Sequence, residues 1–463
     1  MSKFVPAPPF GGFEDFNEVS AKQWKQQIQF DLKGADYNET LVWKSPEGIN
    51  VKPFYHQDDF KKDFQPIPGQ PKSWKIAQKI FIDDEKIANN ITLDAINRGA
   101  QAIIFSAAED FDPKIVFKNF PFEKASIYFN LTFLSEAFFG KLDKYFASKE
   151  ATVHYNIDLI GNLARTGNWF HNLKKDHEIL DVIFQKYDAA NILSVDVALY
   201  QNAGANSVQQ LAYALAHANE YLNHIAIETK QSVTLNFQIA TGSNYFFEIA
   251  KIRALRKLYA TLAKEYGATE TCHILATPSK RNKTLYDYNV NLLRSTTECM
   301  SAVLGGADSV CNMPYDELYH KSNEFGERIA RNQLLILKHE SYFDAVSNPA
   351  DGTYYIESLT DELAEKALQL FKEIEKGGGF LQLLKEGTIQ KKIKESAEKE
   401  QQLFDSGQLK LLGTNYHLNK NDRMKGDLEL FPFVKHNPVK TLIAPIIEKR
   451  LAENVEQQRI SNE

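Results

Sequence analysis

Short apolar segments alternate with longer amphipathic segments along most of this chain, beginning at about residue 76. The short segments are rich in β-branched and aromatic residues, or they alternate apolar with polar positions, as strands do. They predict eight strands, at residues 102–105, 126–129, 153–160, 193–199, 233–239, 272–276, 309–311 and 343–346. The longer segments carry apolar residues at helical spacing and predict helices at residues 134–147, 179–184, 207–218, 246–266, 285–304, 325–339 and from 359 onward.

Eight strands that alternate with helices over about 270 residues predict an α/β fold, the (β/α)8 barrel. An open doubly wound sheet is the alternative. One βα unit is especially clear: the strand 193–199 is followed by the glycine-bearing turn 201–205 and by a helix that Ser207 caps. In barrels of this kind, the loops that follow the strands build the functional site.

The first 75 residues have a different pattern. A helix is expected where Trp24, Ile28 and Leu32 share one face, and the segments 41–43 and 49–53 flank a Ser-Pro-Glu-Gly turn, which predicts a hairpin. This part is short for a hydrophobic core of its own. We expect residues 1–75 to form an arm that contacts another subunit; a small cap packed on the chain's own barrel is the alternative.

The C-terminal part also departs from the barrel pattern. The helical pattern fades after Gly413, and residues 419–440 combine prolines, glycine and many charges, which is typical of a linker. Residues 441–459 could form one last helix. The sequence therefore predicts a barrel at residues 76–410 and a linker with a terminal helix at residues 411–463.

Composition narrows the classes of function. The formal net charge of −6 disfavours a large nucleic-acid interface. No apolar run approaches the roughly 20 residues that span a bilayer, and the N-terminus has no apolar core of a signal peptide. The three cysteines are few and widely spaced, which fits a reducing cytoplasm. We therefore expect a cytoplasmic protein without nucleic-acid or membrane partners.

Polar residues on two neighbouring strands are candidates for a metal site. His154, Asn156 and Asp158 alternate along one expected strand and so share a face, and Asp196 lies on the next strand. A histidine and two carboxylates near a barrel mouth could bind a metal. No HxH pair or HExxH helix accompanies them. We expect a polar face satisfied by its neighbours, and the alternative is a metal enzyme that uses His154, Asp158 and Asp196.

The stretch 193–205, with the sequence LSVDVALYQNAGA, carries a resemblance. It resembles the G-Y-H-x-Q-E-A-G-A stretch of the methylmalonyl-CoA mutase family, whose Tyr and His act at the reacting centre. The matching positions are Gln201, Ala203, Gly204 and Ala205. Ala198 stands at the position of the Tyr, and Leu199 stands at the position of the His.

Further stretches are similar to motifs of this family and follow in the same order. They are residues 246–256 (FFEIAKIRALR), 294–302 (RSTTECMSA), 325–337, 349–357 (PADGTYYIE) and 413–415. The resemblance implies the barrel of the adenosylcobalamin-dependent acyl-CoA mutases. In that barrel, CoA threads the interior and cobalamin caps the mouth.

The chain departs from the catalytic members where the chemistry occurs. Residues 74–80 are similar to the family's W-T-I-R-Q-Y-A-G-F motif, but Lys79 stands where the Tyr touches the substrate. Together with Ala198 and Leu199, this makes three degenerate positions. None of the eleven histidines belongs to a D-x-H-x-x-G motif, which marks the cobalamin domain of the family. We therefore expect no catalytic, cofactor-binding or metal-ligating residues on this chain, and no cobalamin domain.

Residues 23–34 and 51–55 resemble the small (beta) subunits of two-chain family members. This implies a non-catalytic barrel in a heterodimer with a catalytic large subunit. The large subunit would hold adenosylcobalamin and the acyl-CoA, and would interconvert (R)-methylmalonyl-CoA and succinyl-CoA in propionate metabolism. An active mutase barrel that uses a cobalamin domain on a separate chain is the alternative. Leu199 and Ile239 also lead us to expect a filled barrel interior instead of an open channel.

Overall fold

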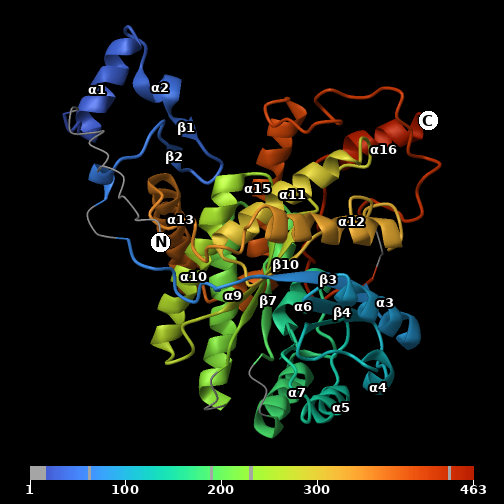
Figure 1. The fold of residues 1–463 in the computed structure, drawn as a ribbon. Coiled ribbons are helices and arrows are strands. Elements are labelled where there is room, and N and C mark those ends of the chain that lie inside the picture. Colours follow the sequence, from blue (N-terminus) through green and yellow to red (C-terminus); the bar gives the residue numbers. More distant parts are fainter. Residues whose placement is uncertain (1–16, 61–63, 188–190, 229–232, 436–438) are drawn as a thin grey trace, which may run out of the picture.

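Eight parallel strands form the centre of the molecule and helices enclose them (Figure 1). The computed structural model describes residues 17–60, 64–187, 191–228, 233–435 and 439–463. The strands are β3 (Lys75–Phe81), β4 (Ala102–Ala107), β5 (Ser126–Leu131), β6 (Val153–His154), β7 (Ser194–Asp196), β8 (Asn236–Thr241), β9 (His273–Pro278) and β10 (Ser309–Cys311). They pair in the order β6-β5-β4-β3-β10-β9-β8-β7, and a parallel bridge between Ile157 and Leu193 joins the two ends. The (β/α)8 fold class predicted from the sequence is confirmed.

One of the eight expected strands was wrong. Residues 343–346 form a turn, and the remaining strand of the barrel is β3, which pairs with β4 on one side and β10 on the other. Lys75 and Lys79 are exposed on β3, whereas Ile76 and Ile80 are buried. The lysines interrupt the apolar run by which the other strands were recognised.

The barrel helices follow the strands in the expected alternation. They are α3 (Glu85–Asn97), α4 (Pro113–Val116), α5 (Glu136–Phe146), α7 (Leu173–Lys186), α9 (Ser207–Glu228), α10 (Tyr245–Glu265), α11 (Val290–Gly305), α12 (Glu324–Leu335) with the π-helical turn η2 (Ile336–Glu340), α13 (Tyr354–Lys376), α14 (Phe380–Lys385) and α15 (Thr388–Asp405). Two short helices, α6 (Leu159–Thr166) and α8 (Ala198–Asn202), follow β6 and β7 directly. They place their residues at the mouth of the barrel, where the strands end.

The main core lies between the sheet and the helices. Ile103 and Phe105 on β4, and Ile127 and Phe129 on β5, are all fully buried on the outer face of the sheet. Their neighbours in sequence face the barrel interior, because side chains alternate along a strand. Phe117 completes this aromatic layer, with its ring centroid 5.2 Å from that of Phe105.

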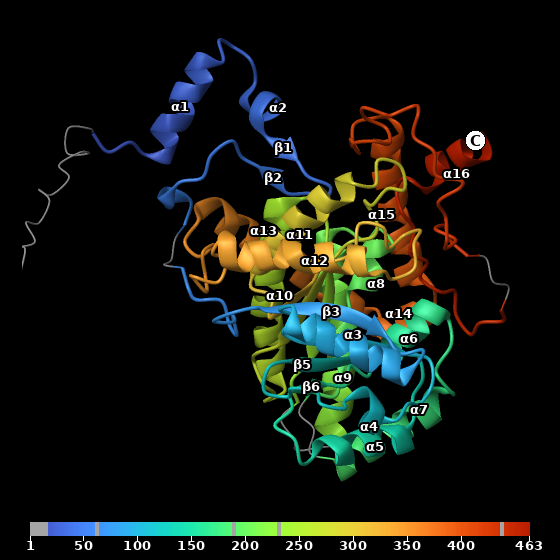
Figure 2. The same ribbon diagram turned by 45° about the vertical axis from the view of Figure 1, so that its right-hand side comes forward.

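The N-terminal segment has two parts that behave differently. The hairpin of β1 (Trp43–Lys44) and β2 (Asn50–Val51) packs on the barrel: Ile49 is fully buried in the main core. The helix α1 (Ala21–Asp31) buries none of its residues, and in Figures 1 and 2 it projects away from the barrel. A capping box between Ser20 and Gln23 begins this helix. The helix α2 (Tyr37–Leu41) and the 3-10 turn η1 (Gln57–Asp59) accompany it.

The C-terminal segment returns to the barrel. Its helix α16 (Glu453–Ser461) is shorter than the expected helix, and residues 439–450 lie in an irregular conformation. Ile446 and Leu451 are nonetheless buried, so this segment packs against the rest of the chain. No helix in the described part of the chain has the length and apolarity that crossing a bilayer requires.

The aromatic layer between β4, β5 and the helices should dominate the stability of this half of the barrel. Phe117 is 1% exposed and its ring contacts several other phenylalanines. We expect Phe117→Ala to lower the free energy of unfolding by about 3–5 kcal/mol, because the substitution leaves a cavity. Urea unfolding measures the change. Phe30→Ala is the matched control: Phe30 is 79% exposed on α1, and its loss should cost less than about 0.5 kcal/mol. Equal effects of the two substitutions would contradict this account of the core.

Candidate functional site

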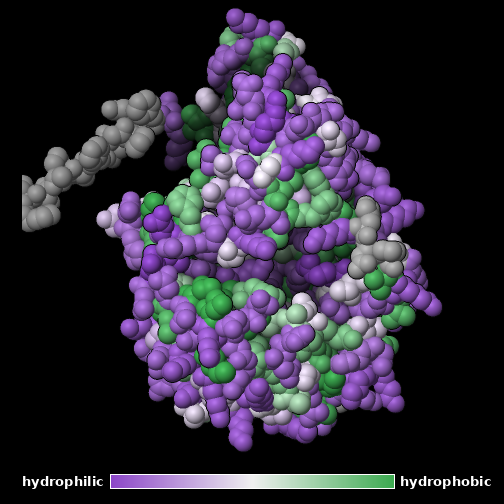
Figure 3. Space-filling model, turned by 90° about the vertical axis from the view of Figure 1, so that its right-hand side faces the viewer, coloured by the Kyte–Doolittle hydropathy of each residue, from purple (hydrophilic) through white to green (hydrophobic). Residues whose placement is uncertain are grey.

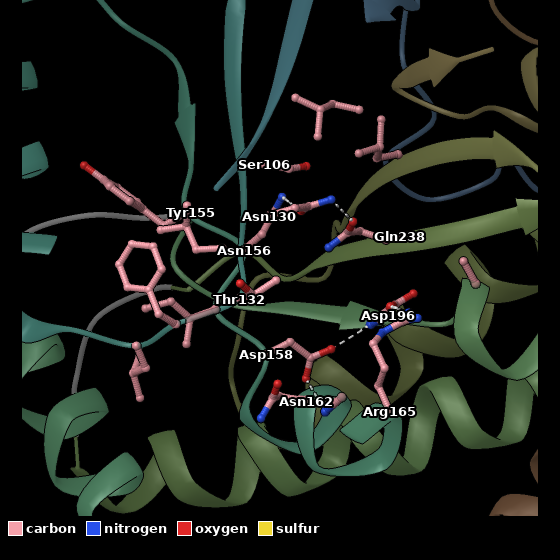
Figure 4. A pocket seen from close by; sticks show the side chains of 18 of the residues that line it. Ser106, Asn130, Thr132, Tyr155, Asn156, Asp158, Asn162, Arg165, Asp196 and Gln238 are labelled. Carbon is pink, nitrogen blue, oxygen red and sulfur yellow. Dashed lines mark hydrogen bonds and ion pairs between the residues drawn. The ribbon is translucent and has the colours of Figure 1, made fainter. Parts of the chain in front are cut away.

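A cavity of about 440 Å³ opens at the mouth of the barrel, next to the ends of β4 to β7. This volume is in the range of small-molecule sites. Figure 3 looks onto this face and shows a hollow across its middle. One wall is apolar and comes from the β5–α5 loop and α5, with Phe133, Leu134, Phe138, Phe139 and Leu142. The opposite wall is polar, and Figure 4 shows Ser106, Asn130, Thr132, Asn156 and Gln238 on it.

A chain of hydrogen bonds between amide side chains forms the floor of the cavity. Asn236 Nδ2 donates to Asn156 Oδ1 at 2.6 Å, and Asn156 Nδ2 donates to Asn130 Oδ1 at 3.4 Å. Asn130 Nδ2 in turn donates to Gln238 Oε1 at 3.1 Å, and Gln238 Nε2 donates to Ser194 Oγ at 3.3 Å. These amides pair with one another across the interior of the barrel, and Asn236 Oδ1 is buried without a hydrogen-bond partner.

Below these hydrogen-bonded amides, aromatic side chains fill the barrel. The rings of Tyr128 and His154 stack with centroids 4.4 Å apart, and the ring of His273 lies 4.3 Å from that of His154. Tyr128 Oη lies 2.7 Å from His273 Nε2 and 2.8 Å from Ser309 Oγ. Burial lowers the pKa of His154 well below its ordinary value and lowers the pKa of His273 to about 3, so both imidazoles are neutral. We call Tyr128, His154 and His273 the aromatic plug.

Leu199 and Ile239, the residues expected to fill the barrel interior, both lie outside it. Ile239 faces the helices α9 and α10 outside the sheet, and Leu199 is fully buried in the main core. The interior at this level is filled instead by the polar rings of the aromatic plug.

Two of the three degenerate positions lie on the cavity wall. Lys79 is near the end of β3 and Ala198 is the first residue of α8. Leu199, the third position, does not line the cavity, because α8 turns its side chain into the core. The cavity therefore offers an amine and a methyl group where the resemblance leads one to expect two phenols.

Of the three residues of the metal-site hypothesis, the structure brings Asp158 and Asp196 together and places His154 apart from them. Asp158 Oδ1 accepts hydrogen bonds from Tyr221 Oη at 2.7 Å and from the Gly161 N–H at 2.8 Å, and it lies 3.0 Å from His217 Nε2. Its Oδ2 accepts from the Asp196 N–H at 2.9 Å. Burial would raise the pKa of Asp158, but His217 and the hydrogen bonds hold it below its ordinary value.

His154 belongs to the aromatic plug and not to the surroundings of Asp158. Within the described ranges, no three His, Cys, Asp or Glu side chains are grouped as metal ligands. The contacts of Asp158 and Asp196 fit a polar face satisfied by its neighbours, whereas His154 Nδ1 is buried without a hydrogen-bond partner.

A group of charges at the mouth was missed by the sequence analysis. Arg165 Nη2 donates to Asp196, and Arg165 Nη1 lies 2.8 Å from Glu448 Oε2. Burial would raise the pKa of Glu448, but Arg165 and Lys280 outweigh it and hold that pKa below its ordinary value. Only Asp196 was a sequence candidate. Residues 165 and 448 are too far apart in the chain for any local pattern to connect them.

The charged group continues on the side of β9 and β10. Lys280 Nζ lies 3.3 Å from Glu317 Oε1, and Lys280 and Lys79 together hold the pKa of Glu317 below its ordinary value, against the effect of burial. Glu327 lies beyond Glu317, and burial raises its pKa to about 7. The cations at the mouth are thus matched by carboxylates of this same chain.

Comparisons with known proteins agree with the sequence resemblance. The family model described as methylmalonyl-CoA mutase matches residues 106–457. A methylmalonyl-CoA mutase small subunit from Porphyromonas gingivalis is 34% identical, and the alignment covers 97% of this chain and 78% of that one. A small subunit from Streptomyces virginiae is 27% identical, with coverage of 82% and 67%. A methylmalonyl-CoA mutase from Rhizobium meliloti is 26% identical, and this chain spans 65% of its length.

Glu327 should make stability depend on pH. Its pKa is about 7 in the folded chain, against an ordinary value of 4.5. Between these two pH values, Glu327 keeps its proton in the folded state and has lost it in the unfolded state. The contribution of Glu327 to the free energy of unfolding therefore falls as pH rises from about 4.5 to about 7. Glu327→Gln removes this titrating carboxyl group, so the variant should become more stable relative to the wild type as pH rises from about 4.5 to about 7. Urea unfolding at a series of pH values measures it.

Glu324→Gln is the control, since Glu324 lies on the same helix with its side chain 80% exposed. A stability difference between Glu327→Gln and wild type that stays constant from pH 4.5 to 8 would contradict the prediction.

Proposed function

Because this chain belongs to the methylmalonyl-CoA mutase family, we propose that it is the small, non-catalytic subunit of a two-chain mutase. It supports a catalytic large subunit that interconverts (R)-methylmalonyl-CoA and succinyl-CoA with adenosylcobalamin. The observation that carries this proposal is the cavity wall, where Lys79 and Ala198 stand at the positions of the family's two tyrosines.

The side chains at these positions cannot perform the expected chemistry. The methyl group of Ala198 neither donates a hydrogen bond nor transfers a proton. Lys79 presents a flexible cation in place of a phenol, and carboxylates of the same chain lie around it. Leu199 has no proton to transfer and faces the core.

The aromatic plug supports the same proposal. A thioester of CoA that threads the barrel needs a passage along the axis. Tyr128 and His154 are buried there, and hydrogen bonds to His273 and Ser309 fix the phenol of Tyr128. Opening a passage would break these hydrogen bonds and leave buried polar groups without partners, which costs about 1–3 kcal/mol for each group.

The mouth does not fit the corrin ring that the family implies. Residues 442–451 run across the loops that follow β6, β7 and β9, through backbone hydrogen bonds to Gly167, Asn202 and Arg281. They place the carboxylate of Glu448 beside Arg165 and Lys280. We infer that adenosylcobalamin and the acyl-CoA are held by the large subunit, and we derive no step through the cofactor on this chain.

The helix α1 supports contact with the large subunit. Trp24 is 49% exposed and Phe30 is 79% exposed, and both lie on the part of the chain that projects from the barrel. Exposed aromatic side chains on a projecting helix are favourable anchors for a protein partner. We propose that this helix binds the large subunit of the heterodimer.

We place the complex in the cytoplasm, where propionate-derived thioesters would be its substrates. Cys272, Cys299 and Cys311 are free and buried, and burial raises the pKa of each thiol. Unreactive free thiols of this kind suit a reducing compartment.

The purified chain should not isomerise methylmalonyl-CoA when adenosylcobalamin is supplied, because it lacks the groups at the reacting centre. The co-expressed heterodimer should turn over, and Lys79→Ala in this chain should change that turnover by less than about twofold. A catalytic contact at Lys79 would instead cost about a hundredfold or more. A coupled assay of succinyl-CoA formation measures each case. Turnover by this chain with a free cobalamin-binding chain would overturn the proposal and favour the split-mutase alternative.

Removal of the most exposed aromatic ring on α1 should weaken the heterodimer. We expect Phe30→Ala to raise the dissociation constant for the large subunit by roughly thirtyfold, as the loss of an aromatic anchor does. Biolayer interferometry with the purified large subunit measures it. Gln26→Ala, also exposed on α1, is the control and should bind like the wild type. If both variants bind like the wild type, α1 does not anchor the partner.

A further inference from the structure

The barrel has a weak seam between β6 and β7. β6 has two residues, and its join to β7 consists of the isolated bridge between Ile157 and Leu193 with a few backbone hydrogen bonds. Tyr155 N–H donates to Asn191 O at 2.9 Å, and Ile157 N–H donates to Ile192 O at 2.8 Å. By contrast, β4 and β5 pair over six residues. Past Ser194, whose N–H donates to Ile157 O at 3.0 Å, the two sides continue as the separate short helices α6 and α8. Beyond Ser194 the seam is joined through side chains, as where Asp158 Oδ2 accepts from the Asp196 N–H at 2.9 Å.

The C-terminal segment crosses the seam. We call residues 442–451 the C-terminal strap. On the β6 side, the N–H groups of Leu442 and Ile443 donate to Gly167 O, and that of Ile446 donates to Ala164 O at 2.8 Å. On the β7 side, the Lys449 N–H donates to Asn202 O at 3.1 Å, and the Leu451 N–H donates to Arg281 O in the loop after β9 at 2.9 Å.

Glu448 connects the two sides through its side chain. Its Oε2 lies 2.8 Å from Arg165 Nη1, which belongs to α6. Its Oε1 accepts a hydrogen bond from Asn202 Nδ2 at 2.9 Å, at the end of α8. Arg165, on the β6 side, also donates to Asp196 at the end of β7, so a second charged contact crosses the seam.

The strap is firmly attached at both ends. Ile443 is 8% exposed, Ile446 is 4% exposed and Leu451 is 2% exposed. Arg450 Nη1 donates to Lys283 O at 3.1 Å and to Glu456 Oε2 at 2.6 Å, which fixes the strap to the β9 loop and to α16. Because the strap is held beside the seam by these attachments, its contacts with the seam form at a high effective concentration.

We propose that the C-terminal strap is an intramolecular clamp that holds the β6–β7 seam closed, with Glu448 as its central contact. The two sides of the seam are thus held together by residues of this chain. This inference concerns the chain itself and stands whether or not the subunit role is correct.

Hydrogen–deuterium exchange of the full-length chain tests the clamp. We expect Glu448→Gln to speed exchange about tenfold in peptides that cover residues 157–167, 193–203 and 442–451, because a charged hydrogen bond across the seam is weakened. The side chains of Arg165 and Glu448 are 41% and 34% exposed, so a much larger effect is not expected. Peptides that cover β4 and β5 should exchange as in the wild type.

Glu398→Gln is the matched control, since Glu398 lies on α15 with its side chain 60% exposed, and its Oε1 is 3.8 Å from Lys394 Nζ on the same helix. If Glu448→Gln does not fold, Glu448→Asp keeps the charge and shortens the reach by one methylene, and should show the same local acceleration. Unchanged exchange at the seam in a folded variant would overturn the proposal. Equal acceleration in all peptides would also overturn it, because Glu448 would then support the whole fold and not the seam.

Discussion

Polar side chains inside the barrel have no bulk water to bind, so they must bind one another. An unpaired buried polar group costs about 1–3 kcal/mol, and several such groups would exceed the stability of an ordinary domain. The hydrogen bonds among Asn130, Asn156 and Gln238 meet much of this requirement, as do those of Tyr128 and the charges around Arg165. His154 Nδ1 and Asn236 Oδ1 are the exceptions, since both are buried without a hydrogen-bond partner. The same pairing leaves few donors and acceptors free for a ligand.

The opposite faces of the same strands set the stability. Residues of β4 and β5 that point away from the interior are Ile, Phe and similar side chains, and they pack under the helices with almost no exposure. β5 thus separates the polar interior residues Tyr128 and Asn130 from an apolar outer layer, whereas β4 also contributes the apolar Ile104 to the interior. This division explains how the residues at the mouth can be exchanged without loss of the fold, since the main core lies on the other side of the sheet.

The sequence was sufficient for the fold class because the outward-facing residues follow a local pattern. It failed at β3, where Lys75 and Lys79 interrupt the apolar run, and at residues 343–346, where a short apolar segment forms a turn. It found Lys79 and Ala198, both of which lie on the cavity wall, through their positions in family motifs. It could not find the pair of Arg165 and Glu448, because that contact exists only once the chain has returned to the barrel mouth.

The position of Leu199 shows what a histidine would meet at this point of the chain. The short helix α8 directs Leu199 into the apolar layer outside the sheet, while Ala198 faces the cavity. An imidazole at position 199 in this conformation would be buried among apolar side chains, where its polar atoms would lack partners. Its neutral form would be favoured, and it would still not reach the cavity. The backbone of α8 and the side chain that it carries are therefore adapted to each other, and a histidine alone would not restore an active site.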